Sequence, residues 1–233
     1  MLPLAILCGG LGTRMRPHTL RVPKPLIEVC GEPFLAHLLR SVARASVRDV
    51  VLLVGYLGEM IVDAVGDGAA FGLRVRYAFD GELQLGTAGA VRRALPLLGE
   101  RFLVSFGDAY LELDYADVVR RFEQAGTAGL MTVYPWDGGE VRPNAATDGV
   151  LVTCYDKEAR PPAVQYVDYG LSAFRADAFA DLVPGEPADL GYVNRRLIAA
   201  HQLAAYVVGT PPSEVGSPAG LAETERRLQR LLP

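Results

Sequence analysis

The chain has 233 residues with a mean hydropathy of +0.19, and half of its residues are apolar. Such a chain can bury a large core, which excludes disorder as its main state. The 23 basic and 27 acidic residues give a formal net charge of −4. This balance argues against a general basic surface for nucleic acid, and it permits a local cationic pocket for a small anion.

The first 134 residues alternate between short β-rich runs and segments with a helical spacing of apolar residues. In the first such segment Phe34, Leu38 and Val42 recur every fourth residue and form one apolar face. The predicted strands are 4–8, 49–55, 73–79, 102–106 and 129–134, and the predicted helices are 34–45, 58–65, 87–98 and 115–124. The alternation predicts an α/β fold of three layers, with a mostly parallel central sheet and helices on both faces. In such sheets ligands bind at the carboxyl ends of the strands.

The alternation stops at residues 135–149, a run rich in Gly, Pro and Asp that predicts a loop or a hairpin connection. The later predicted elements are strands at 150–155, 164–174 and 204–208, a helix at 190–200 and a C-terminal helix from 218. No segment has the composition of a linker, so we expect a single domain over 1–233.

The cysteines and the apolar runs bear on the cellular compartment. Cys8, Cys30 and Cys154 form no CxxC pair, so a disulfide framework and a structural zinc site are both disfavoured. The apolar run 2–8 lacks a preceding basic residue and ends in a glycine loop, unlike a signal peptide. No run approaches the roughly 20 apolar residues of a membrane span. We therefore expect a soluble, cytoplasmic protein with no membrane partner.

A glycine loop directly follows the first predicted strand. Gly9, Gly10 and Gly12 let the backbone approach a ligand closely and direct N–H groups towards an anion. Arg14 and Lys24 would neutralise a polyphosphate bound there. The alternative is an ordinary tight turn with two solvated cations. A dinucleotide-binding fingerprint and a P-loop both fail, because their required Gly and Gly-Lys-Ser/Thr positions are absent.

The loop Gly9-Gly10-Leu11-Gly12-Thr13-Arg14-Met15-Arg16-Pro17, followed by Lys24-Pro25, resembles the signature of sugar-1-phosphate nucleotidyltransferases, the NDP-sugar pyrophosphorylases. Further segments are similar to that family's base-binding, metal-binding and sugar-phosphate-binding motifs. These segments are Leu85-Gly86-Thr87-Ala88-Gly89, Gly107-Asp108, Asp156-Lys157 and Glu214-Val215-Gly216-Ser217-Pro218. The resemblance implies the Rossmann-like, GT-A-like nucleotidyltransferase fold.

The resemblance also implies a reaction and a set of site residues. An NTP and a sugar 1-phosphate would give an NDP-sugar and pyrophosphate, with Mg²⁺ as cofactor. Residues 1–134 would mainly bind the nucleotide and 135–233 mainly the sugar phosphate. The implied catalytic residues are Arg14 and Lys24; the nucleotide-binding residues are Leu7, Gly9, Gly10, Gly12, Thr13, Gly86, Thr87 and Ala88; the sugar-phosphate-binding residues are Asn144, Lys157, Asp168, Tyr169 and Gly170; and the metal ligands are Asp108 and Glu214. Tyr169 also fits a core aromatic.

The implied chemistry needs no activated side-chain nucleophile. A phosphate monoester, with a second pKa of about 6, is already largely dianionic at neutral pH. Positioning and charge neutralisation then carry most of the catalysis. Only two of the 23 basic residues are lysines, Lys24 and Lys157, and both fall where the family places a phosphate-binding lysine. An ammonium is a compact point charge that a guanidinium does not reproduce.

The sequence leaves alternatives for the identity of the nucleotide base and of the acceptor substrate. Gln84 and Gly81 depart from the family's base-binding pattern. The amino-acid sequences of residues 106–115 and 166–179 are most similar to D-glycero-D-manno-heptose-1-phosphate guanylyltransferase-like proteins. This similarity favours GTP and a heptose 1-phosphate as the substrates. The alternatives are uridylyl or thymidylyl transfer to a hexose 1-phosphate, cytidylyl transfer to phosphocholine, and a non-catalytic nucleotide-sugar-sensing paralogue. The sequence does not predict an oligomeric state.

Overall fold

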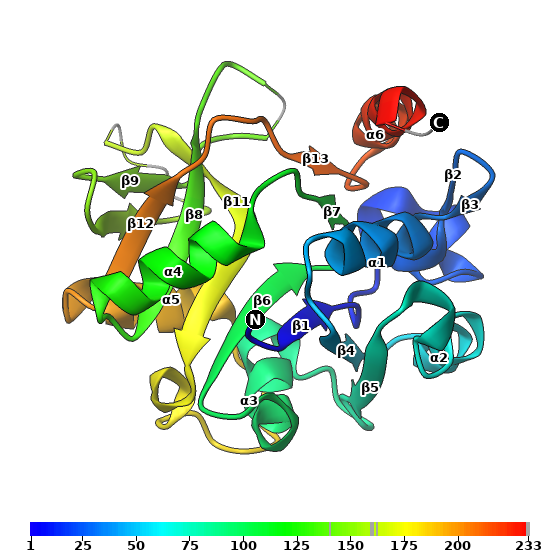
Figure 1. Cartoon of the computed structure of the whole chain (residues 1–233), viewed down its shortest axis with the longest axis horizontal. Coiled ribbons are helices and arrows are strands. Elements are labelled where there is room, and N and C mark those ends of the chain that lie inside the picture. The colour runs from blue at the N-terminus through cyan, green and yellow to red at the C-terminus, as the bar shows by residue number, and fades with distance from the viewer. Residues whose placement is uncertain (140, 159–160, 162, 232–233) are drawn as a thin grey trace.

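The computed structural model describes residues 1–139, 141–158, 161 and 163–231. Their centre is a nine-stranded sheet with the order β10-β9-β11-β6-β1-β4-β5, in which β8 pairs with β11 and β12 (Figure 1). Its strands are β1 (Leu4–Leu7), β4 (Asp49–Val54), β5 (Arg74–Phe79), β6 (Arg101–Phe106), β8 (Gly129–Pro135), β9 (Ala145–Thr147), β10 (Val152–Tyr155), β11 (Tyr166–Arg175) and β12 (Leu203–Val207). The helices are α1 (Phe34–Arg44), α2 (Gly58–Val65), α3 (Gly86–Leu98), α4 (Tyr115–Ala125), α5 (Leu190–Ala199) and α6 (Pro218–Leu231).

Most strands of the sheet point the same way. β1 pairs in parallel with both β4 and β6, and β5 pairs in parallel with β4. β11 runs antiparallel to β6 and β8, and β10 runs antiparallel to β9. Only these two, β10 and β11, oppose the others in the described sheet. The predicted mostly parallel sheet is therefore confirmed.

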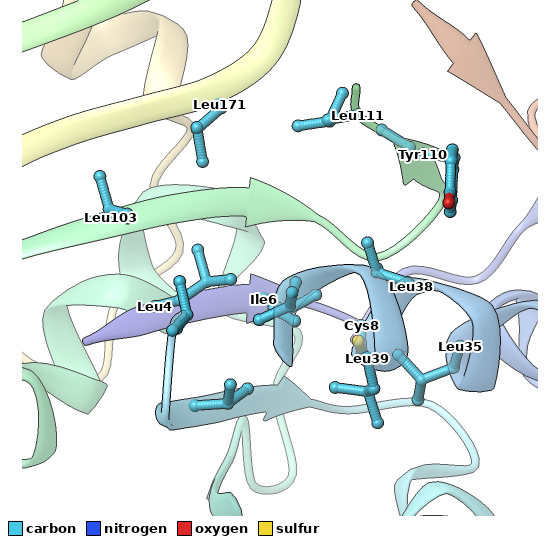
Figure 2. Packing of buried hydrophobic residues seen from close by; sticks show 14 of the residues in the cluster. Leu4, Ile6, Cys8, Leu35, Leu38, Leu39, Leu103, Tyr110, Leu111 and Leu171 are labelled. Atoms are coloured by element: carbon cyan, nitrogen blue, oxygen red, sulfur yellow. The ribbon is translucent and has the colours of Figure 1, made fainter. Parts of the chain in front are cut away.

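Alternate residues of β1 and β4 face opposite sides of the sheet, as the two-residue period of a strand requires. Leu4 and Ile6 belong to one apolar cluster, which includes residues of α1 and α4. Ala5 belongs to a second cluster, which includes residues of α3 and α5. Figure 2 shows Leu35, Leu38 and Leu39 of α1 around the end of β1 that leads to Cys8, in the same cluster as Leu4 and Ile6. The predicted three layers are confirmed. None of the described helices combines the length and apolar character needed to cross a bilayer.

The structure adds short strands that the sequence pattern does not indicate. β9 lies inside the predicted connection 135–149 and pairs with β10, so this connection contains one strand of a hairpin. β2 (Glu28–Val29) pairs with β3 (Glu32–Pro33), and β7 (Ala109–Tyr110) pairs with β13 (Ser213–Glu214). A strand of two residues is too short to show a hydrophobic period in the sequence. Its strand geometry comes from tertiary contacts instead.

Candidate active site

The glycine loop is held in place by one buried residue and one turn. Gly12 has φ 59°, and a Cβ there would lie 2.8 Å from Thr19 Cγ2. The Thr19 hydroxyl donates to the Gly12 carbonyl at 2.8 Å. A 3-10 turn, Thr13–Met15, follows, and Met15 is buried while Arg14 is exposed. The loop therefore anchors itself through Met15 and presents Arg14 at the surface.

A cavity of about 360 Å³ lies at the carboxyl ends of β1, β4, β5 and β6. Ten of the residues implied by the resemblance line it: Leu7, Gly9, Gly10, Gly12, Thr13, Arg14, Lys24, Gly86, Thr87 and Asp108. We call it the nucleotide cavity. Its position agrees with the rule for ligands of parallel sheets.

Ala88 does not lie on the wall of this cavity. Its side chain is fully buried in the second apolar cluster. Its N–H donates to the Ala188 carbonyl at 2.9 Å, because the start of α3 packs against the chain before α5. Ala88 therefore lies outside the wall of the nucleotide cavity, and its part in nucleotide binding stays a prediction. Thr87 next to it does line the cavity, and its hydroxyl donates to Asp189 at 3.1 Å.

A second cavity, of about 1100 Å³, lies beside the first. It is lined by all five residues expected to bind the sugar phosphate and by Glu214: Asn144, Lys157, Asp168, Tyr169, Gly170 and Glu214. We call it the acceptor cavity. Arg14, Phe106 and Asp108 line both cavities. The two groups of residues expected from opposite halves of the chain therefore meet at one cation and one carboxylate.

The two expected metal ligands come together through the β7–β13 pairing. Glu214 is paired with Ala109, and the Val215 N–H donates to the Asp108 carbonyl at 2.8 Å. A Cβ at Gly216 would lie 2.5 Å from Glu214 Oε1, so the glycine makes room for this carboxylate. Asp108 Oδ2 also accepts a hydrogen bond from Lys24 Nζ in an ion pair. Both residues line the acceptor cavity, and a pair of carboxylates suits Mg²⁺, which takes its other ligands from phosphate oxygens and water.

Lys157 lies between two aromatic rings in the acceptor cavity. Its Nζ is 5.8 Å from the centroid of Phe106 and 5.5 Å from that of Tyr155. The Tyr155 hydroxyl donates to Asp168 Oδ2, and the Gly170 N–H donates to Asp168 Oδ1, both at 3.1 Å. Burial raises the pKa of the Asp168 carboxyl, and the nearby Lys157 ammonium opposes this rise. The cavity therefore presents a positioned cation beside a carboxyl group.

Asn144 and Tyr169 shape the acceptor cavity from its β-sheet wall. Asn144 Oδ1 accepts from the Asp168 N–H at 2.8 Å, so this side chain fixes the start of β9 against β11. Tyr169 is 1% exposed and belongs to the first apolar cluster. Its hydroxyl accepts from the Glu112 N–H at 3.3 Å. The alternative of a core aromatic is confirmed for Tyr169, although the residue also borders the cavity.

Cys8 closes the base of the nucleotide cavity as an apolar group. Its side chain is buried, and burial together with the nearby Asp108 carboxylate raises the pKa of the thiol far above its usual value. A thiol that stays protonated is a poor nucleophile. The structure therefore gives Cys8 a packing role beside the glycine loop.

Replacing Gly107 with alanine is expected to destabilise the fold. The added Cβ would lie 2.7 Å from Cys8 Sγ and 2.8 Å from the Leu7 carbonyl oxygen, where β1 ends. Overpacking of this kind costs about 1–3 kcal/mol, which in a chain of this size lowers Tm by roughly 2–12 °C. Thermal unfolding measures the effect. Gly209→Ala is the control, because no atom lies within 4 Å of its Cβ position. Equal Tm values for the two variants would contradict the prediction.

Asp80 and Phe106 line the nucleotide cavity, and the sequence analysis singled out neither. Each directly ends or follows a strand, β6 for Phe106 and β5 for Asp80. A charged residue directly after a predicted strand was an available signal for Asp80. Its burial, at 7% exposure, could not be seen without the fold.

Comparisons with known proteins show which proteins the chain resembles. Over 111 residues the chain is 41% identical to the N-acetylmuramate alpha-1-phosphate uridylyltransferase of Neisseria meningitidis, covering 47% of this chain and 48% of that protein. Over 132 residues it is 36% identical to the mannose-1-phosphate guanylyltransferase catalytic subunit beta of Danio rerio, covering 55% of this chain and 36% of that protein. The matched segments thus span about half or less of these curated relatives.

Two solved structures share the fold over nearly the whole chain. HddC from Yersinia pseudotuberculosis, complexed with GMP-PN, superposes with a TM-score of 0.81 at 21% identity and covers 98% of this chain and 100% of that one. A Bacillus anthracis protein in complex with a sucrose gives a TM-score of 0.86 at 19% identity, covering 97% and 95%. A family model described as nucleotidyl transferase matches residues 5–230, from β1 to α6. The chain therefore belongs to the nucleotidyl transferase family.

Proposed function

We propose that the protein joins an NTP to a sugar 1-phosphate and releases pyrophosphate. The observation that carries this proposal is that the nucleotide and acceptor cavities share Arg14 and Asp108. A transfer between two phosphates needs both polyanions to meet beside neutralising charge. The two curated relatives named above act, by their names, on an N-acetylmuramate 1-phosphate and a mannose 1-phosphate, which supports the substrate class.

The residues take separate parts in this reaction. The glycine loop holds the nucleotide phosphates through backbone N–H groups, with Arg14 and Lys24 offsetting their charge. Lys157 holds the sugar phosphate, one of whose oxygens attacks the α-phosphorus. The new P–O bond forms as the bond to the β-phosphate oxygen breaks, and pyrophosphate leaves with that electron pair. A Mg²⁺ ion bound by Asp108 and Glu214 would supply further charge neutralisation at the α-phosphate.

The finer proposal is a guanylyltransferase that acts on a heptose 1-phosphate in the cytoplasm. The similarity of residues 106–115 and 166–179 to heptose-1-phosphate guanylyltransferase-like proteins supports the base and the acceptor. The name of the Danio rerio relative and the nucleotide in the HddC structure are consistent with a guanine nucleotide. The Neisseria relative is by name a uridylyltransferase, so the base must be tested directly.

The test is pyrophosphate release with Mg²⁺ from ATP, GTP, CTP, UTP and dTTP against heptose, mannose and glucose 1-phosphates and phosphocholine. We expect the highest rate with GTP and a heptose 1-phosphate. Turnover only with UTP or dTTP and a hexose 1-phosphate would overturn the finer proposal and keep the enzyme class. Turnover only with CTP and phosphocholine would overturn the sugar acceptor. NTP binding by calorimetry without any turnover would favour a sensing paralogue.

Lys157→Arg is expected to raise the KM for the sugar phosphate about tenfold, which corresponds to about 1.4 kcal/mol. The planar guanidinium is larger than the ammonium that lies near the Phe106 and Tyr155 rings, and it cannot take the same point position. Steady-state kinetics with the sugar phosphate varied measures this change. The KM for the NTP should stay constant, because Lys157 lines only the acceptor cavity. An unchanged KM for the sugar phosphate would contradict this role for Lys157.

A further inference from the structure

A buried carboxylate, Asp80, lies at the end of the nucleotide cavity opposite Asp108. Asp80 directly follows β5, and Asp108 follows β6. The sheet order β6-β1-β4-β5 separates these strands by three spacings, which at about 4.8 Å each places their ends about 14 Å apart. A nucleotide whose phosphates lie at Asp108 and Arg14, extended along the strand ends, therefore brings its base towards Asp80.

The Asp80 carboxylate lies against two glycines, Gly9 and Gly55. A side chain at Gly9 would place its Cβ 3.3 Å from Asp80 Oδ2, and a side chain at Gly55 would place its Cβ 2.9 Å from the same atom. Both glycines lie at the carboxyl ends of strands, β1 and β4. The absence of their side chains lets a charged group lie at the strand ends beside the cavity.

Hydrogen bonds hold the position of Asp80 and leave its carboxylate with acceptor capacity. The Asp80 N–H donates to the Val54 carbonyl at 2.9 Å, and Arg93 donates to the Asp80 carbonyl at 3.0 Å. The carboxylate accepts from the Leu85 N–H at 3.4 Å. A carboxylate offers about four lone-pair sites, so this bond leaves most of them for a ligand.

We infer that Asp80 selects the base, accepting hydrogen bonds from the N1–H and the 2-amino group of guanine. The inference rests on the proposed function and deepens it by assigning the residue that reads the base. Guanine presents these two donors side by side, and a carboxylate can accept both at once. Uracil and thymine present one N–H between two carbonyl oxygens, and a carboxylate repels these oxygens. Adenine and cytosine present a donor beside an acceptor, so only one of their groups fits.

Burial gives this pairing a large effect. The low exposure of Asp80 raises the pKa of its carboxyl, with the Leu85 N–H and Arg93 opposing the rise. A buried carboxylate without enough donors is unfavourable, so a base that supplies two donors is strongly preferred to one that supplies a single donor.

The test is Asp80→Asn, which replaces two acceptors by one acceptor and one donor. We expect kcat/KM for GTP to fall about 100-fold, because one hydrogen bond to a charged group is lost and the carboxamide N–H of the variant meets a donor of guanine. Xanthosine triphosphate, which carries a carbonyl in place of the 2-amino group, should become a substrate for this variant. Glu82→Gln is the control, because Glu82 is an exposed carboxylate in the same loop and lines neither cavity.

The outcomes separate this inference from the proposed function. A wild-type enzyme that prefers another NTP, or an Asp80→Asn variant that loses activity equally with every NTP, would overturn base selection by Asp80 and leave the nucleotidyl transfer intact. Absence of wild-type turnover with every substrate pair would overturn the proposed function instead. Calorimetry with GTP and xanthosine triphosphate would then still test the exchange of base preference in the variant.

Discussion

Replacing Asp108 with asparagine is expected to lower kcat about 1000-fold, or about 4 kcal/mol in the barrier. Asp108 borders both cavities and lies beside Glu214 through the β7–β13 pairing. A carboxamide is a weak ligand for Mg²⁺ and carries no charge, so the metal would bind less tightly where the two phosphates meet. Pyrophosphate release at increasing Mg²⁺ concentration measures the effect, and the variant should need much more Mg²⁺ for half-maximal rate.

The fold of the Asp108→Asn variant should be preserved. The carboxamide oxygen can still accept from Lys24, which now pairs with Asp108. Thermal unfolding checks this point. Asp63→Asn is a matched control, because Asp63 is an exposed carboxylate of α2 that lines neither cavity. Near-normal turnover of Asp108→Asn at low Mg²⁺ would contradict a metal-binding role for Asp108.

Arg14→Ala is expected to lower kcat by roughly 100- to 1000-fold, the usual range for removing one donor that stabilises transition-state charge. Arg14 is an exposed cation of the glycine loop, and it borders both cavities. Its guanidinium can contact two phosphates with separate N–H groups while the α-phosphorus changes partners. Single-turnover kinetics at saturating substrates isolates this step, and Arg14→Lys should keep part of the rate.

Arg16→Ala is the control for Arg14. Arg16 is exposed, lies two residues along the same segment and lines neither cavity. Its loss removes one positive charge from the same surface and leaves the cavities unchanged. If Arg16→Ala lowered kcat as much as Arg14→Ala does, the effect would come from general surface charge, and the specific role of Arg14 would be wrong.

Long elements of this fold were predictable because their signals are local. The apolar face of α1 and the β-rich runs of β1 and β4 follow from a period that a window of ten or so residues contains. β9, β7 and β13 were missed because two or three residues contain no period. Their strand geometry comes from partners that lie far away in the sequence, as for β7 and β13.

The residues of the candidate site divide in the same way. The sequence by itself indicated the nucleotidyl transferase family through its glycine loop. Through that resemblance it also gave Arg14, Lys24, Asp108, Lys157 and Glu214 as candidate site residues, because each belongs to a short motif within one segment. Only the tertiary structure decided that Arg14 and Asp108 lie between two cavities. It also decided that Ala88 packs beneath the cavity wall and that Asp80 is buried at its far end. The reason is physical: burial and proximity arise from sheet order and strand pairing, which join residues that a linear motif keeps apart.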